Sequence, residues 1–376
     1  MSFVLLAFWP IEAVVAQPIA RPDENWQSAA DHYLAGEWSV AEAIVLDTTP
    51  AALLESARRA FERWRAVPAA DPTARRVAAR RFQASAILPL KLLMATTGRV
   101  PAPDAEPMLE TAAREAWQRL DAFDEEHGGF AAAQVRRFRT WWRLGLVQHR
   151  IASGLLAEAR QEAFAIDAPA ADVAAVAALA LLRGVAIETR ARLADEPLSA
   201  TTAVSLRRLP TASRIEPMLL AMDDAGKHYR RALAAMPGDR EATLRLARMA
   251  LERDRLPEAE RLLAPLLTQA CPDAVCGLAY LFSGEVYEAR KDLERAASAY
   301  ARASAVPAVR HSALVAMMQA AMRRGSAGGA YDLTHQFATP VALAPGQPPD
   351  AWNVYTSGRL IEGDRILAHM TAALVP

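Results

Sequence analysis

The chain has 376 residues, of which 52% are hydrophobic, and it carries 43 basic and 43 acidic side chains. This length suits two or three ordinary domains or one long repeat array, and the apolar content excludes a disordered chain. The balanced charge excludes a general electrostatic attraction to nucleic acid or to an anionic membrane.

An apolar stretch runs from Phe3 to Ala16. It is too short to span a bilayer, which takes about 20 apolar residues in a helix. Its length and the small residues before Gln17 are typical of a secretory signal, so we predict a signal peptide over residues 1–20 and a periplasmic or secreted protein. Because no basic residue precedes the stretch and Glu12 interrupts it, a cytoplasmic protein with an apolar N-terminal segment packed on the fold is the alternative.

Residues 24–135 have the composition of helices without a clear repeat. The segment "AADHYLAGEWSVAEAIV" has the residue order of a helical hairpin, but no matching segment follows one period later. Further helical segments are predicted at about 51–66, 73–97 and 106–124. We interpret this region as degenerate helical repeats.

A constant spacing begins further along the chain. Alanines recur at intervals of 34, 37 and 34 residues, at Ala225, Ala259, Ala296 and Ala330. A large side chain follows the first three of them four residues later, as Tyr229 follows Ala225. A period this regular indicates a repeated structural unit.

Each such alanine is preceded by a second helical segment. Gly284 precedes Ala296 by 12 residues, and Gly145 precedes Ala157 by the same interval in "WWRLGLVQHRIASGLLAEA", which also carries Trp141. This pattern resembles the tetratricopeptide repeat family, whose units of about 34 residues are helix-turn-helix pairs. The resemblance implies an all-α fold: a right-handed superhelical solenoid of antiparallel helix pairs, with degenerate N-terminal repeats and a C-terminal capping helix.

The resemblance places the repeats over residues 136–345. Pro197, Pro210 and Pro217 interrupt the segment in which the first helix of one repeat should lie. We therefore predict one long helix from Val173 to Leu193 and an insertion at about 195–216. Residues 346–376 are predicted to form a loop rich in proline and glycine, followed by the capping helix.

In this family the first helix of each pair lines a concave groove, and the resemblance implies which residues face it. By position within each repeat these are Trp142, His149, Arg150, Leu244, Arg248, Leu281, Glu285, Val315, Gln319 and Met322. Apolar rows flanked by charges of both signs suit an extended peptide or a partner helix better than a highly charged polymer. We therefore predict a non-catalytic scaffold that binds a protein or peptide partner of unknown identity.

Cys271 and Cys276 are the two cysteines of the chain. In an exported protein they could close a small disulfide loop, whereas in a reducing compartment they would stay free thiols. Zinc usually needs a second cysteine pair or added histidines, and the sequence has no second pair. The pair is a disulfide candidate, and no metal site is predicted.

No pattern in the sequence predicts catalysis. No glycine-rich phosphate loop precedes Lys-Ser or Lys-Thr, the histidines form no pair at metal-binding spacing, and no serine lies in the glycine pattern of a nucleophile elbow. We therefore predict no enzyme activity, no catalytic residue and no cofactor.

Two other functions are alternatives. The first is a cytosolic regulatory or nucleic-acid-binding repeat protein, because arginines and aromatic residues mix at 58–81 and 135–143. We disfavour nucleic acid, since these aromatic residues fall on the inward helix face. The second is an accessory helical domain of a cell-envelope glycan-processing system, for which the groove offers Trp142 alone as an aromatic platform. The oligomeric state is not predicted.

Overall fold

The computed structural model describes residues 132–195, 212–267, 270–271, 273–326, 328–329, 331–333 and 350–374, with scattered residues between 28 and 111. The chain divides into two compact units, residues 1–96 with 100–123, and residues 97–99 with 124–376. The continuous described ranges belong to the second unit. The predicted signal peptide and almost all of the predicted degenerate repeats lie outside the described residues.

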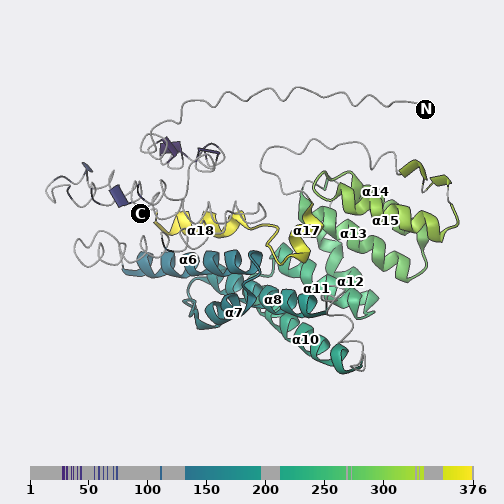
Figure 1. Cartoon of the computed structure of the whole chain (residues 1–376), viewed down its shortest axis with the longest axis horizontal. Coiled ribbons are helices and arrows are strands. Elements are labelled where there is room, and N and C mark those ends of the chain that lie inside the picture. Colours follow the sequence, from purple (N-terminus) through teal and green to yellow (C-terminus); the bar gives the residue numbers. More distant parts are fainter. Residues whose placement is uncertain are drawn as a thin grey trace, which may run out of the picture. The chain divides into compact units, whose positions relative to one another are not determined.

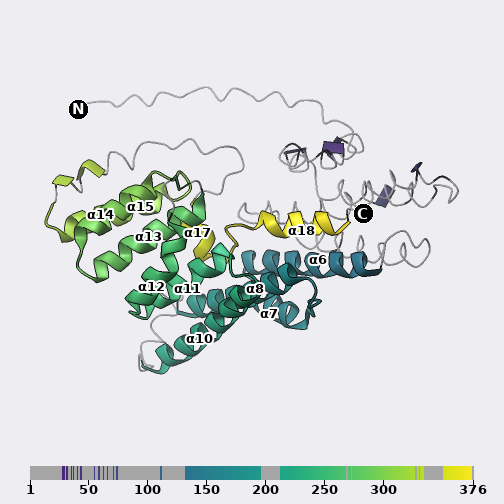
Figure 2. The same cartoon turned by 180° about the vertical axis from the view of Figure 1, so that it is seen from behind.

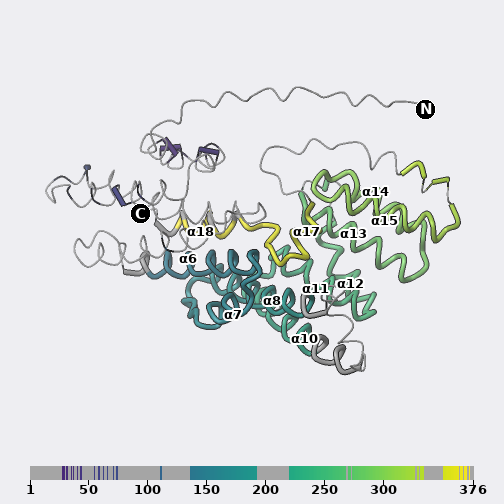
Figure 3. The backbone as a smooth tube through the Cα atoms, viewed as in Figure 1, coloured from purple at the N-terminus to yellow at the C-terminus, as the bar shows by residue number. Residues whose placement is uncertain are grey.

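The second unit is helical, and its described residues contain no strand (Figure 1). In chain order the helices are α6 (Ala132–Ala152), α7 (Leu156–Ala165), α8 (Val173–Asp195), α10 (Ala212–Ala235), α11 (Arg240–Glu252), α12 (Leu256–Leu263), α13 (Ala274–Ala289), α14 (Leu293–Ser304), α15 (Arg310–Arg323), α17 (Ala351–Thr356) and α18 (Asp364–Leu374). A short 3-10 turn, Ala264–Leu266, continues α12. The backbone trace in Figure 3 follows the same order.

Neighbouring helices pair, and the pairs stack in chain order (Figure 1, Figure 2). Helix α6 packs against α7, α8 against α10, α11 against α12, and α13 against α14, with α15 next to α14. First helices of successive pairs also touch, as α6 touches α8 and α11 touches α13. The predicted all-α fold of stacked helix pairs is therefore confirmed for the described residues.

The same turn ends the first helix of four units. The second residue after α6, α11, α13 and α15 has a positive φ, at Gly154, Asp254, Lys291 and Gly325 respectively. The N–H of the following residue then donates to a carbonyl five residues back, at 2.8–2.9 Å. This left-handed turn satisfies the last carbonyls of the helix and reverses the chain.

Close approach of a glycine to a tyrosine aligns two of the pairs. A Cβ atom added at Gly284 on α13 would overlap the ring of Tyr300 on α14, and one added at Gly184 on α8 would overlap the ring of Tyr229 on α10. Helix α8 is therefore the first helix of the unit whose second helix is α10, and the insertion lies inside that unit.

The ends of this insertion differ from the sequence prediction. Helix α8 continues to Asp195, and α10 begins at Ala212, so Pro217 lies inside a helix. A proline removes one backbone hydrogen bond from a helix. The extensive packing of α10 along α8 offsets that loss.

The predicted capping helix forms as α18 and begins at Asp364. It packs against α6, as both views show (Figure 1, Figure 2). The rings of Trp141 on α6 and His369 on α18 stack with centroids 4.2 Å apart. The chain thus returns from its last described repeat to α6, the first of the labelled helices.

We predict that Gly284→Ala lowers the free energy of unfolding by about 1–3 kcal/mol, because the added methyl group has no room beside Tyr300. Urea unfolding measures this change. Gly238→Ala is the matched control, since a Cβ at Gly238 meets no heavy atom within 4 Å. Equal stability of the two variants would contradict the helix register.

Candidate partner-binding groove

A buried carboxylate lies where α8 and α10 meet the C-terminal helices. Glu188, on α8, is 1% exposed. Its carboxylate accepts hydrogen bonds from the hydroxyls of Tyr229 on α10 and Tyr355 on α17, and from the guanidinium groups of Arg192 and Arg245. Burial alone would raise the pKa of Glu188, but the two arginines and the Tyr229 hydroxyl hold this pKa below its usual value. The carboxylate is therefore ionised at neutral pH.

Arg245 extends this network from α11 to the C-terminal helices. Its buried guanidinium pairs with Glu241, one helical turn earlier, at 3.0 Å. The same group donates to the carbonyl of Arg359 at 3.0 Å and lies 4.5 Å from the centre of the Tyr355 ring. The second oxygen of Glu241 accepts the backbone N–H of Ile361 at 3.0 Å. These bonds offset the cost of removing both charges from water.

The C-terminal segment, residues 350–374, contacts the first helices of several pairs. Asp350 accepts hydrogen bonds from the backbone and the hydroxyl of Ser312 on α15. The rings of Trp352 and Tyr355 then pack edge-on against Phe282 of α13, with centroids 5.8 and 5.7 Å away. The Tyr355 hydroxyl also reaches Glu188 of α8, the carbonyl of Arg359 accepts from Arg245 of α11, and α18 packs against α6. The segment therefore occupies part of the face that the resemblance assigns to the groove.

A row of charged side chains joins three first helices next to this network. Arg192 on α8 pairs with Glu252 on α11 at 2.9 Å, and Glu252 also accepts from Arg248 at 2.9 Å. Arg248 in turn pairs with Glu285 on α13. Its guanidinium carbon lies 5.1 Å from the centre of the Trp352 ring. These charges satisfy one another within the fold.

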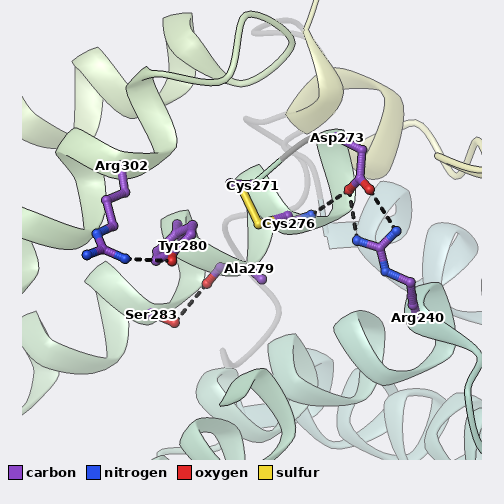
Figure 4. The surroundings of a disulfide bond; sticks show 8 residues. All are labelled: Arg240, Cys271, Asp273, Cys276, Ala279, Tyr280, Ser283 and Arg302. Atoms are coloured by element: carbon purple, nitrogen blue, oxygen red, sulfur yellow. Dashed lines mark hydrogen bonds and ion pairs between the residues drawn. A yellow bond between two sulfur atoms is a disulfide. The ribbon is translucent and has the colours of Figure 1, made fainter. Parts of the chain in front are cut away.

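The connection between α12 and α13 contains a disulfide and forms an ion pair with α11 (Figure 4). Cys271 and Cys276 form a disulfide with their Cα atoms 5.4 Å apart. Between them, Asp273 accepts the backbone N–H of Cys276 at 3.0 Å and pairs with Arg240 of α11 at 2.7 and 2.9 Å. The Arg240 hydrogen bond lowers the pKa of Asp273. These contacts fix the start of one repeat relative to the preceding one.

Within the described ranges, no group of three or more histidine, cysteine, aspartate or glutamate side chains could hold a metal ion. The buried carboxylates of Glu188 and Glu241 are instead neutralised by arginines. None of the described helices combines the length and apolar character needed to cross a lipid bilayer.

Residues 221–274 match the sequence profile of the tetratricopeptide repeat. The chain contains a tetratricopeptide repeat. The matched range covers the latter part of α10, the pair of α11 and α12, and the first residue of α13. No curated protein matches the chain. Tetratricopeptide repeats are protein-interaction modules and are in general not catalytic, so the match supports a role as an interaction scaffold.

Four of the implied groove residues are buried among the described helices, which differs from the exposed position expected of them. Leu244 and Leu281 belong to the hydrophobic core that α11 to α15 share with α17. Trp142 and His149 are buried on α6 because that helix packs against α7, α8 and α18. None of these four side chains offers a partner a free apolar surface.

The implied charged residues of the groove are paired with one another or with neighbouring helices. Arg248 and Glu285 form the ion pair described above, and Arg150 lies 3.7 Å from Glu162 of α7. A ligand charge would have to compete with these existing pairs. They are therefore structural contacts between neighbouring helices.

Three implied groove residues are exposed on one face of α15. Val315, Gln319 and Met322 follow one another at intervals of four and three residues, which places them on the same side of a helix. Val315 is 38% exposed and Met322 is 63% exposed. Because Asp350 contacts this helix near its start, at Ser312, the latter part of α15 is the open part of the implied groove.

Sequence reasoning missed the network around Glu188. One signal was present: Glu188 is the first acidic residue of α8, after a largely apolar run, and an unpaired carboxylate there would be costly. Its partners Tyr229, Arg245 and Tyr355 lie 41, 57 and 167 residues further along the chain. No repeat period connects these distances.

We predict that Glu188→Gln lowers the free energy of unfolding at neutral pH by about 3 kcal/mol or more, because it leaves buried arginine charge without its partner. The pKa of Glu188 is lowered in the folded chain from an unfolded value of 4.5. Its contribution is therefore complete above that value and is lost as the pH falls through the lower folded pKa. The stability difference between the wild type and the variant should shrink over that acidic range.

Urea unfolding at several pH values measures this difference. Glu294→Gln, at an exposed acid in the first turn of α14, is the control and should cost no more than about 0.5 kcal/mol. A Glu188→Gln variant as stable as this control would contradict the network.

Proposed function

We propose that the chain is a non-catalytic repeat scaffold that binds a protein partner through the open face of α15. The exposed stripe of Val315, Gln319 and Met322 carries this proposal. Two apolar side chains with a hydrogen-bonding amide between them suit the apolar face of a partner helix or an extended peptide. Methionine adapts its shape to different partners, which also suits a binding surface.

The C-terminal segment covers other parts of the implied groove, and this supports a partner site on α15. A partner seated over α11 and α13 would have to displace Trp352 and Tyr355 and to break the ion pairs of Arg248. A partner on α15 displaces none of these contacts. The surface of α15 is thus the lower-cost docking site on the first helices.

Met322→Asp is expected to weaken partner capture by at least about 1 kcal/mol, because it places a charge among the apolar contacts that provide the binding energy. The free energy of unfolding should change by less than about 0.5 kcal/mol, since Met322 is exposed. The partner is first isolated with the wild-type chain from intact cells, and its affinity for each purified variant is then measured.

Arg261→Glu is the matched control, because Arg261 is exposed on a second helix, α12. It should leave capture unchanged. If Arg261→Glu abolished capture while Met322→Asp had no effect, the partner would bind the outer face and the α15 proposal would be wrong.

We also propose that the protein is exported. The apolar stretch at the N-terminus and the pairing of Cys271 with Cys276 support this location, since such bonds persist in oxidising compartments. The mature protein is expected to begin near Gln17 and to have no thiol that alkylates without prior reduction. Mass spectrometry of the native protein tests both, and a chain that begins at Met1 with two alkylated cysteines would contradict export.

A further inference from the structure

A pocket of about 420 Å³ opens where the end of α7 meets α8 and α10. Its apolar lining includes Ile166, Val176 and Leu179. Its polar lining is formed by Asp167, Arg183, His228 and Arg231. This volume lies within the range of small-molecule sites, and a mainly apolar wall with a few polar groups is their usual composition. The pocket shares no residue with the open face of α15.

Arg183 is held in place by the end of α7. Its Nε donates to the carbonyl of Ala163 at 2.9 Å, and its Nη2 donates to the carbonyl of Ile166 at 3.1 Å. The guanidinium carbon also lies 5.0 Å from the centre of the Phe164 ring. Its Nη1 donates to none of the described residues. Arg183 is therefore fixed before any ligand arrives and keeps donor capacity.

Helix α10 adds two more nitrogen-bearing groups. His228 is 4% exposed, and its buried Nδ1 has no hydrogen-bond partner in the described part of the chain. Arg231, one turn further along α10, is exposed and forms no ion pair with a described residue. A buried polar atom without a partner is costly, and a ligand oxygen would satisfy it in the tautomer that carries the ring proton on Nδ1.

The charges of the pocket are unbalanced. Burial lowers the pKa of Arg183, and the nearby positive charge of Arg231 lowers it further. The negative charge of Asp167 acts in the opposite direction. Burial also lowers the pKa of His228, and Arg231, Arg183 and Lys227 lower it further against the attraction of Asp224. A neutral imidazole leaves the lining with two arginines and one aspartate, a net charge of one positive unit.

We propose that this pocket binds a small monocarboxylate, with the carboxylate held by Arg183 and Arg231 and the apolar body against Ile166, Val176 and Leu179. A single negative charge neutralises the lining. A dianion such as a phosphate monoester would leave an excess negative charge beside Asp167. The apolar wall disfavours anions without a hydrocarbon body.

Calorimetric titration of the full chain with octanoate tests the site. Octanoate should bind, whereas octanol, which has the same body without the charge, should bind at least about tenfold more weakly, because a charge-assisted hydrogen bond is lost. Octyl phosphate should also bind more weakly than octanoate. Arg231→Gln should weaken octanoate about tenfold.

Arg230→Gln is the matched control, because Arg230 is the exposed neighbour of Arg231 on α10 and does not line the pocket. It should leave octanoate affinity unchanged. Ala234→Leu, which adds bulk at the pocket wall, should also reduce binding.

Any of four results overturns the proposal. These are the absence of octanoate binding up to about 10 mM, equal binding of octanol, tighter binding of octyl phosphate, and equal effects of Arg231→Gln and Arg230→Gln. Both arginine variants keep the contacts of Arg183 with α7 and are therefore expected to fold. Thermal melting of each variant checks this expectation. Failure here leaves the α15 proposal untouched, because the two sites share no residue.

Discussion

The carboxylate of Glu188 is buried and ionised, and it is satisfied by groups from four helices. Tyr229 from α10, Arg245 from α11 and Tyr355 from α17 converge on it, together with Arg192 from α8 itself. An ionised carboxylate without such partners would cost several kcal/mol in the interior. The repeats and the C-terminal segment must therefore be assembled together for this residue to be tolerated. The network specifies one arrangement of the helices, while the hydrophobic core around it supplies the larger share of stability.

This constraint determines which surfaces a partner could use. In a simple repeat array each unit contacts its neighbours, and the first helices leave an extended concave surface open. Here residues 350–374 contact α15, α13, α11, α8 and α6, so contacts between distant parts of the chain cover part of that surface. The open stripe on α15 is what the segment leaves. Binding specificity would then depend on a short surface and not on the whole groove.

Contacts between the two helices of a repeat could be predicted from the sequence, because they recur with the repeat. The spacing of Gly284 and Ala296 identified a close helix pair, and the tyrosine that fills the gap lies where the repeat pattern expects it. The long helix α8 was also predicted, and its largely apolar sequence contains no proline. These features depend on neighbours within about one period, which a sequence pattern records.

Contacts without a period were not predictable in this way. Trp352 and Tyr355 pack against Phe282 on α13, more than 60 residues earlier in the chain, and no repeat period indicates this contact. Leu244 and Leu281 were assigned to the groove by position in the repeat, and both are buried with α17 in one core. A repeat register shows which residues share a helix face, but it does not show whether a distant segment covers that face.

A double-mutant cycle between Glu188→Gln and Tyr355→Phe tests most directly whether the buried carboxylate joins the C-terminal segment to the repeats. Urea unfolding of the wild type, both single variants and the double variant provides the coupling free energy. A direct hydrogen bond at 3.1 Å between the two side chains predicts a coupling of about 1 kcal/mol or more. Additive effects, within about 0.5 kcal/mol, would contradict this account.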